Sequence, residues 1–409
     1  MHELAAWLRR PDPVTFPYDA VLDRVHSVGK HFVPPNLLAS LDRARATLGT
    51  PVDSAGQRLA TFLSTALDKW DNRFDNPSYL AFEQLPLPGT GYRAGCPNQA
   101  ALQHDRLFVL LVADLLRFEI EVADGATWLP EIAPDARITA KRCRLGVRAM
   151  RPALARMGVE VEPTSGDPIE VARQVCAAIA SDTTPSERLT LDLSALPVSL
   201  VHDEYMFMRV LQAYESTFAM VAVQLSAAIS AIQRGRAGAA ALVLAEAERA
   251  MGEAGLLFSI VATMRTEAFL TFREFTDGAS AIQSRHYKLM ESLCRRPDAP
   301  RLDSPAYHSV PPVRARVLAD QPTVSSALAA ARTAGVLDPE LDALLTASME
   351  RFEAVLLRWR KTHYRLAVRM LGERRGTGYT EGVPYLDGGR GISVFGAGCP
   401  MAGKLDSAA

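Results

Sequence analysis

The segment Phe352–Gly372, FEAVLLRWRKTHYRLAVRMLG, decides the fold class of this chain. Its apolar residues recur at spacings of 4, 3, 4, 3 and 4, the period of an α-helix with one apolar face. Asp338 and Pro339 supply an N-cap and a proline at the first helical position, and Gly372 supplies a stop. The pattern predicts a helix over 339–371. Its apolar face would carry Phe352, Leu356, Trp359, His363, Leu366 and Met370, with Arg360, Lys361, Arg365 and Arg369 off that face.

Most of the remaining chain has the same helical character. Ala, Leu, Arg, Glu and Met are abundant, and no convincing run of alternating β-branched residues is present. We therefore expect an all-α fold. Further helices are predicted at about 202–233, 238–264, 281–295 and 323–334. Segments rich in Pro, Gly, Asn or Ser predict breaks at 72–100, 163–168, 182–198 and 297–314.

These breaks suggest a main boundary near residue 185. We expect a helical N-terminal domain of unknown role over 1–185, a second helical domain over 186–398 and a tail over 399–409. Gln103–Phe108 faintly echoes the segment around His202, so a degenerate internal repeat is one reading of the first domain. An unrelated helical cap is the other reading, and we prefer it, with His104 as a helix-start residue.

The composition excludes several classes of protein. The 409 residues include 45 Lys and Arg against 46 Asp and Glu, so no basic excess points to nucleic acid. The five scattered cysteines form no CxxC pair, which argues against a disulfide framework or a zinc knuckle and favours the cytoplasm. The N-terminus lacks the apolar core of a signal peptide. The longest uncharged stretch, 216–232, contains Ser and Gln and predicts a buried helix rather than a membrane span.

His363 has two readings. A lone histidine on an apolar face is usually a core residue that is hydrogen bonded to a carbonyl. A neutral imidazole can also bind a metal through its free nitrogen. No His or Cys stands three or four residues away, and no HExxH occurs, so a multi-ligand zinc site is disfavoured. A single axial ligand to haem needs only one histidine and a large apolar slot.

Two other segments have binding potential. Arg273 lies among Phe269, Phe272 and Phe275, just before a loop of small residues. It could hold a carboxylate through two parallel hydrogen bonds, or it could pair with an acidic neighbour at the surface. The glycines of 376–382 leave backbone groups open to a ligand, or they form a simple turn. This segment lacks the pattern of a phosphate loop.

Four segments in order resemble the tryptophan 2,3-dioxygenase and indoleamine 2,3-dioxygenase superfamily of haem enzymes. They resemble the family's LD…HDE…F…HQxYE helix, its FR…SSGFQS segment, its WRxxH…VxRxIG helix and its GTGGSSG loop. The corresponding residues are Leu191-Asp192 with His202–Glu204, Phe207 and Gln212–Glu215; Phe272-Arg273 with Ser280 and Gln283-Ser284; Arg358–His363 with Val368–Gly372; and Gly376–Gly378. The resemblance covers about residues 186–398, and it implies a haem domain there.

The resemblance implies roles for these residues around haem b. His363 would be the proximal iron ligand, and Arg273 would hold the substrate carboxylate. Thr377 would bind the ammonium or carboxylate group of the amino acid when the glycine loop closes. The remaining cofactor contacts would come from Trp359, Phe272 and Gly376, and the remaining substrate contacts from Phe207, Phe269, Leu211, Ser280 and Gly378. No residue is assigned with certainty as an acid or base.

The chain also departs from the family pattern. Leu211 stands where the family has its distal histidine, and leucine can neither accept the indole N–H nor act as a base. Phe269 replaces a tyrosine, as in the indoleamine type. Tyr379 and Thr380 alter the glycine loop, and Ala281-Ile282 replaces Gly-Phe. These changes could accommodate a different aromatic amino acid.

The resemblance implies a haem-dependent oxygenase that uses O2 to cleave the indole C2–C3 bond of L-tryptophan or a close derivative. The alternative is a biosynthetic enzyme of secondary metabolism that monooxygenates or rearranges a modified tryptophan, as in the monodechloroaminopyrrolnitrin synthase branch. A second alternative is a haem-binding protein without turnover, and a third is a helical protein without haem. We expect no nucleic-acid or membrane partner, and a homo-oligomer stays open.

Overall fold

A computed structural model describes residues 2–50, 53–89, 96–162, 165–276, 278–374, 376–377 and 382–396 of the chain. Within these ranges all regular elements are helices. Glu131 and Val201 form an isolated parallel β-bridge. The predicted all-α fold is therefore confirmed. Gly378, Tyr379, Thr380 and the predicted tail over 399–409 lie outside the described residues.

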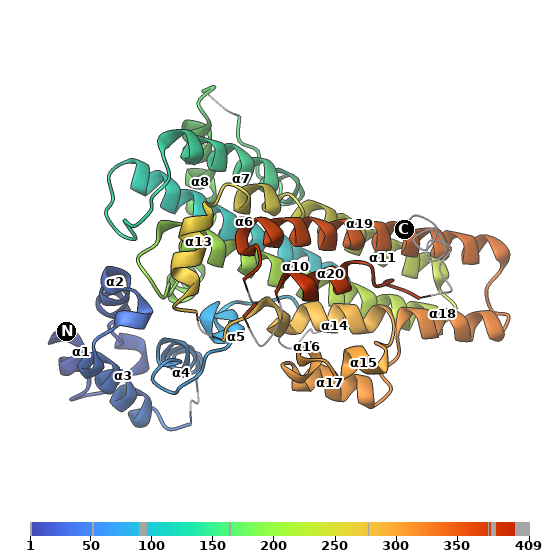
Figure 1. The fold of residues 1–409 in the computed structure, drawn as a ribbon, viewed down its shortest axis with the longest axis horizontal. Coiled ribbons are helices and arrows are strands. Elements are labelled where there is room, and N and C mark those ends of the chain that lie inside the picture. Colours follow the sequence, from blue (N-terminus) through green and yellow to red (C-terminus); the bar gives the residue numbers. More distant parts are fainter. Residues whose placement is uncertain are drawn as a thin grey trace.

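The helices follow one another with mostly short connections (Figure 1). The first part of the chain forms α1 (His2–Trp7), α2 (Tyr18–Val28), α3 (Pro35–Thr47), α4 (Ser54–Ala66), α5 (Asn76–Tyr79), α6 (Pro97–Ala123), α7 (Ala136–Arg156), α8 (Pro168–Asp182) and α9 (Pro185–Leu193). The second part forms α10 (His202–Gln233), α11 (Ala237–Ala254), α12 (Leu257–Val261), α13 (Thr266–Arg273), α14 (Arg285–Cys294), α15 (Ala299–Leu302), α16 (Pro305–His308), α17 (Pro311–Leu318), α18 (Val324–Thr333), α19 (Pro339–Leu371) and α20 (Val383–Arg390). Short 3-10 helices are η1 (Pro13–Thr15), η2 (Lys30–Phe32), η3 (Phe82–Gln84) and η4 (Ala281–Gln283).

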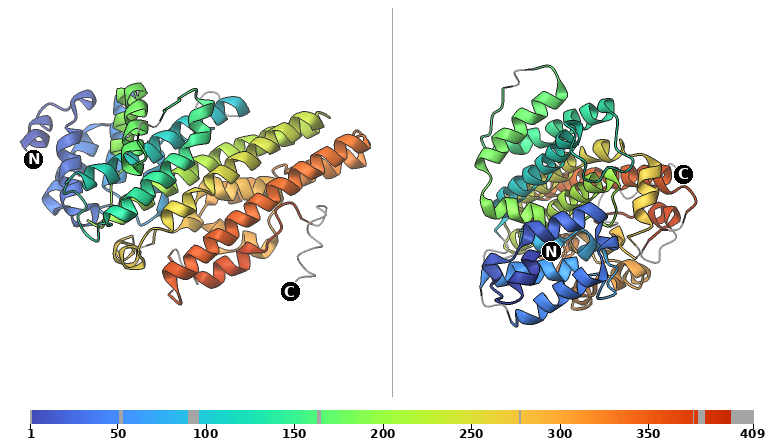
Figure 2. Two further views of the ribbon diagram at one scale, coloured as in Figure 1. Left: turned by 90° about the horizontal axis from the view of Figure 1, so that it is seen from above. Right: turned by 90° about the vertical axis from the view of Figure 1, so that its left-hand side faces the viewer.

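The long helix α10 is the centre of the main apolar core. It is buried along most of its length because α6, α11, α13, α14 and α18 all pack against it. Figure 2 shows α11 and α19 running side by side, and α11 contacts α10 on its other side. By length and composition, α10 is the one helix among the described residues that could cross a membrane. However, 78% of its most apolar window is buried inside the protein.

The N-terminal helices form a smaller core of their own. Apolar residues from Leu4 to Leu67 pack together and take in Leu193 and Leu196. Figure 1 shows these helices, α1 to α4, beside the rest of the molecule. By contrast, α6, α7 and α8 share the main core with α10 and α11. Apolar packing thus crosses the boundary expected near residue 185, and the division into domains at that residue stays a prediction.

Helix ends that carry strong local signals are where the sequence predicted them. α19 spans 339–371 as expected, because the Asp338 side chain accepts the Leu341 N–H and Gly372 has a left-handed φ of +56°. α10 and α18 also match the expected segments within about one residue. His104 does not start a helix as expected, because α6 already begins at Pro97.

Some predicted breaks are wrong, because they contain helices. α9 lies within 182–198, since Thr184 and Glu187 form a capping box and Pro185 occupies the first helical turn. Proline starts short helices in the other breaks too, where α5 lies within 72–100 and α15 and α16 lie within 297–314. The predicted helix 281–295 is divided at Ser284, whose side chain caps α14.

Candidate active site

One cavity brings the predicted site residues together. It has a volume of about 290 Å³ and lies between α10, α13, α14, α19 and α20. Predicted residues on its wall are Phe207, Leu211, Phe269, Phe272, Arg273, Ser280, Trp359, His363, Gly376 and Thr377. Gly378 was also predicted here, but it lies outside the described residues. The structure therefore gathers segments that are far apart in the sequence, while the role of each residue stays a prediction.

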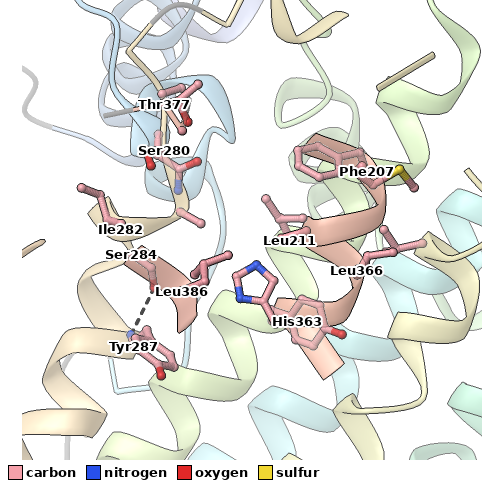
Figure 3. A pocket seen from close by; sticks show the side chains of 18 of the residues that line it. Phe207, Leu211, Ser280, Ile282, Ser284, Tyr287, His363, Leu366, Thr377 and Leu386 are labelled. Atoms are coloured by element: carbon pink, nitrogen blue, oxygen red, sulfur yellow. Dashed lines mark hydrogen bonds between the residues drawn. The ribbon is translucent and has the colours of Figure 1, made fainter. Parts of the chain in front are cut away.

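His363 occupies the middle of this cavity. In Figure 3 its ring lies between Leu211 and Leu366 on one side and Leu386 and Ser284 on the other. The apolar face of α19 directs it there, with the Trp359 ring centroid 5.3 Å away. Burial alone lowers the pKa of His363 to about 4, so its ring is neutral at ordinary pH.

The ring nitrogens of His363 have no hydrogen-bond partner among the residues that the structure describes. The carbonyl bond expected of an ordinary core histidine is therefore not seen in those residues. A neutral imidazole with an available nitrogen, facing an apolar cavity, meets the requirement for a single axial ligand to haem iron. Among the described residues, no group of three or more His, Cys, Asp or Glu side chains could hold a metal ion on its own.

An aromatic wall lines one side of the cavity. Phe207 of α10 lies 5.9 Å from Phe269 and 5.3 Å from Phe272 between ring centroids, and the two residues of α13 are 5.6 Å apart. Leu211 lies one turn beyond Phe207 on the same helix and points into the cavity beside His363 (Figure 3). These side chains offer an apolar surface without a titratable group.

A polar end adjoins the aromatic wall. Arg273 is half-buried at the end of α13, and its pKa is lowered by burial and by the nearby Arg374 guanidinium. Ser280 and Thr377 lie close to each other at the top of Figure 3 and line the same cavity. Two guanidinium groups near one another favour an anion between or beside them. This end is thus suited to a carboxylate.

Residues of the N-terminal region also line the cavity, which the sequence did not predict. These residues are Asn76, Tyr79, Leu80 and Phe82. They are fixed against the α13–α14 loop, because the Gln283 side-chain oxygen accepts the N–H groups of both Asn76 and Ser280, at 2.8 and 3.0 Å. The loop approaches so closely that a Cβ at Gly278 would lie 2.8 Å from the Phe74 carbonyl oxygen.

Arg360 corrects the sequence analysis, which expected it off the apolar face of α19. It is only 7% exposed, and it donates to the Tyr287 hydroxyl, the Ile392 carbonyl and the Glu291 carboxylate. An arginine can lie inside because these acceptors come from α14 and from the segment after α20. A sequence pattern on one helix cannot reveal partners on others. The one sequence feature that hinted at a buried cation was Glu291, an acidic residue among the apolar residues of α14.

Comparisons with known proteins identify several relatives of the chain. No protein-family model matches the chain. The tryptophan 2,3-dioxygenase of Erythrobacter litoralis is 30% identical over 246 residues, which cover 51% of this chain and 94% of that protein. The enzyme of the same name from Caulobacter vibrioides is 28% identical over 250 residues, covering 51% and 93%.

A third relative has the same name and a similar extent of match. The tryptophan 2,3-dioxygenase of Anaeromyxobacter dehalogenans is 27% identical over 220 residues, covering 46% of this chain and 83% of the relative. Each match leaves about half of the present chain outside it. Because the match to the Erythrobacter protein spans nearly all of that relative, the chain belongs to the tryptophan 2,3-dioxygenase family, as a divergent member.

Proposed function

We propose that this protein is a haem-dependent oxygenase that inserts oxygen at the indole C2–C3 bond of L-tryptophan or a close derivative, with a product of the N-formylkynurenine type. The observation that carries the proposal is the neutral ring of His363, which lies in an apolar cavity and has no hydrogen-bond partner among the described residues. The names of the relatives support the reaction class. Haem, when bound, would supply the activation of O2.

The chain's own residues would hold the cofactor and position the substrate. His363 would hold the haem iron through a ring nitrogen, with Trp359 packed against its ring. Phe207 and Phe272 would exclude water and stack against the indole. Arg273 would donate to the substrate carboxylate through its planar fork of N–H groups. Holding an aromatic amino acid at both ends in this way is a proximity contribution to the rate.

Leu211 cannot take part in proton transfer. It points into the cavity where a base would be useful, and its side chain has no titratable group. The aromatic wall beside it has none either. We therefore assign the protein a role in binding, orientation and water exclusion, and we name no acid or base.

A second candidate function is monooxygenation or rearrangement of a modified aromatic amino acid. The observation in its favour is the part of the wall that comes from the N-terminal region. Tyr79, Leu80 and Phe82 add bulk to the cavity from a segment that the motif matches do not include. A substrate with a different ring outline would then be selected by these side chains.

The two functions can be separated by analysing the products. The protein is reconstituted with haem, reduced, and supplied with labelled O2 and a panel of aromatic amino acids. Incorporation of two labelled oxygen atoms into tryptophan supports the leading proposal. Incorporation of one atom supports the alternative. If no amino acid is consumed while haem binds normally, the catalytic proposal is wrong.

A further inference from the structure

The helix α7 carries a concentration of positive charge that the proposed function does not use. Its 21 residues include seven Arg and Lys but no Asp or Glu, in a chain with a formal net charge of −1. Figure 1 shows α7 in the upper part of the molecule, away from α1 to α4. Two of the seven cations are paired with acids, and these are Arg142, with Glu119 and Asp203, and Arg156, with Asp105 and Glu253.

The other five cations share one face of the helix. They stand at spacings of four, three, four and three residues, and all five are exposed; they are Arg137, Lys141, Arg144, Arg148 and Arg151. Residues at this spacing lie on the same side of an α-helix. We call these five residues the basic row. None of them forms an ion pair or a side-chain hydrogen bond with another residue that the structure describes.

The helices packed against α7 have no unpaired acid to offer. These helices are α6, α8, α11 and α12. Every Asp and Glu of α6, α8 and α11 is paired with an arginine outside the basic row, and α12 has no acidic residue. The acids in the loops at the two ends of α7 form no ion pair with the row either, and these are Glu131, Asp135, Glu160 and Glu162. The described part of the chain therefore leaves the basic row without a counter-charge.

The basic row is unfavourable for the helix that carries it. Like charges three or four residues apart repel one another on a helix surface. Arg137 also lies in the first turn of α7, where the helix dipole favours an acidic side chain and none is present. A row of charges that opposes helix stability and lacks a partner among the described residues is suited to a partner outside the chain.

We propose that the basic row binds an acidic helix of a partner protein. From Arg137 to Arg151 the row is about 21 Å long, with a cation about every 5 Å, because a helix rises about 1.5 Å per residue. A second helix with Asp or Glu at the same spacing presents carboxylates at the same interval. On one face of an extended strand the side chains are about 6.6 Å apart, so its carboxylates would lose register along the row.

The side chains of the row also match carboxylates in their chemistry. Four of the five cations are arginines, whose planar forks bind a carboxylate through two parallel hydrogen bonds. This surface lies outside the cavity that holds His363, because none of its residues lines that cavity. The proposal therefore does not depend on haem or on the proposed reaction.

Two other anionic partners fit the row less well. A helix that lies on a membrane places apolar side chains in the lipid, and no exposed large apolar side chain of the described residues belongs to α7. Proteins that bind single-stranded nucleic acid combine cations with aromatic side chains that stack on the bases, and α7 has no aromatic residue. A membrane and a nucleic acid are thus outcomes that the test must separate from an acidic helix.

The test is a titration of the full-length protein with fluorescent peptides at low salt. One peptide is an alanine-rich helix with glutamates at the spacing of the basic row, and its control has glutamine at those positions. We expect the glutamate peptide to bind and its affinity to fall as salt is added, because the ion pairs are exposed. The glutamine peptide should not bind. If the two peptides bind equally, or if neither binds, the row is a solvated face and the proposal is wrong.

Reversal of two charges in the middle of the row locates the binding site. The double variant Arg144→Glu, Arg148→Glu should bind the glutamate peptide about tenfold to a hundredfold more weakly, since two attractions become two repulsions. The matched control is Lys361→Glu with Arg365→Glu, which makes the same charge change four residues apart on the exposed face of α19. This control should bind as wild type does. An equal loss in both double variants would show a response to net charge alone and would overturn the assignment.

Two further measurements test the alternatives. A single-stranded oligonucleotide with the same number of charges as the glutamate peptide, and vesicles that contain phosphatidylserine, should bind more weakly than that peptide. Tighter binding of either one, lost in Arg144→Glu, Arg148→Glu, would assign the row to that anion and overturn the proposal. The thermal unfolding midpoint of this variant should stay the same or rise, because repulsion within the row is relieved. A marked fall would show that the row has partners inside the protein and would contradict the proposal.

Discussion

Two histidines, His104 buried in the core and His363 partly exposed on the cavity wall, show how the interior of this protein differs between its core and its cavity. His104 of α6 and His363 of α19 have the same pKa, about 4, and burial is the largest cause for both. His104 Nδ1 is hydrogen bonded to the Ser216 hydroxyl at 3.1 Å, and its ring packs edge-on against Phe108. His363 has no such partner in the described residues and faces open space. Burial therefore lowers the pKa of both rings, but His104 has a hydrogen-bond partner in the core, whereas His363 lines the cavity.

The largest expected effect separates the two histidines by haem retention. His363→Leu should lose haem, because the variant has no axial nitrogen in the cavity. His104→Leu should retain haem at the wild-type ratio, although it makes the same chemical change to a histidine with the same pKa. The measurement is the amount of haem per chain after gel filtration of the reconstituted proteins. If both variants retain the same amount of haem, His363 is not the haem ligand and does not differ from His104 in this respect.

Arg273 extends the comparison to the substrate end of the cavity. The structure leaves Arg273 half-buried, so its bond to a substrate carboxylate is expected to be worth about 1.5–3 kcal/mol. Arg273→Ala should weaken amino-acid binding by about tenfold to a hundredfold, with Lys as a poor replacement. Haem content should not change. Titrations with tryptophan and with tryptamine provide the control, because the amine lacks the carboxylate and should bind wild type and variant alike.

Without haem, replacing His104 should destabilise the protein more than replacing His363, which is the reverse of their expected effects on haem retention. His104→Leu strands the Ser216 hydroxyl in the core and should cost about 1–3 kcal/mol in the free energy of unfolding. His363→Leu removes an unpartnered polar ring and should cost less or nothing. Urea unfolding of both variants without haem measures the difference. A larger loss at His363 would indicate a structural bond that the geometry does not show.

The smallest effect concerns pH. Because the pKa of His363 is lowered from 6.5 to about 4 in the folded protein, the unfolded chain binds a proton that the folded chain does not bind between these values. Stability is therefore full above pH 6.5 and falls as the pH drops toward 4. His363→Leu should reduce this fall, and His104→Leu should reduce it as well. Urea midpoints across this range test the prediction. No change in slope for His363→Leu would mean that its ring is already protonated or exposed.

The sequence alone predicted the part of the cavity wall that α19 provides. α19 has an N-cap, an N-terminal proline, a stop glycine and an unbroken apolar period, so its bounds and the direction of His363 followed from local rules. The resemblance to the family supplied the residues of α10 and α13. The partial burial and the aromatic contacts of Phe207 depend on tertiary packing that no single segment encodes.

Other features depended on contacts between distant segments and could not be predicted. Arg360 was expected off the apolar face of α19, but acceptors on α14 and at Ile392 make its burial tolerable. The contribution of Asn76 to the cavity depends on its hydrogen bond to Gln283, which is 207 residues away in the sequence. α9 was missed because Pro185 was interpreted as a break, although proline is favoured in a first helical turn.

The most direct test of the central claim is whether iron is bound to the His363 ring. Resonance Raman spectra of the reduced, haem-loaded protein should show an iron–imidazole stretching band in wild type and in His104→Leu. The band should be lost in His363→Gly, and free imidazole should restore it together with haem binding. If His363→Gly keeps the wild-type band without imidazole, another residue binds the iron and the account of the cavity is wrong.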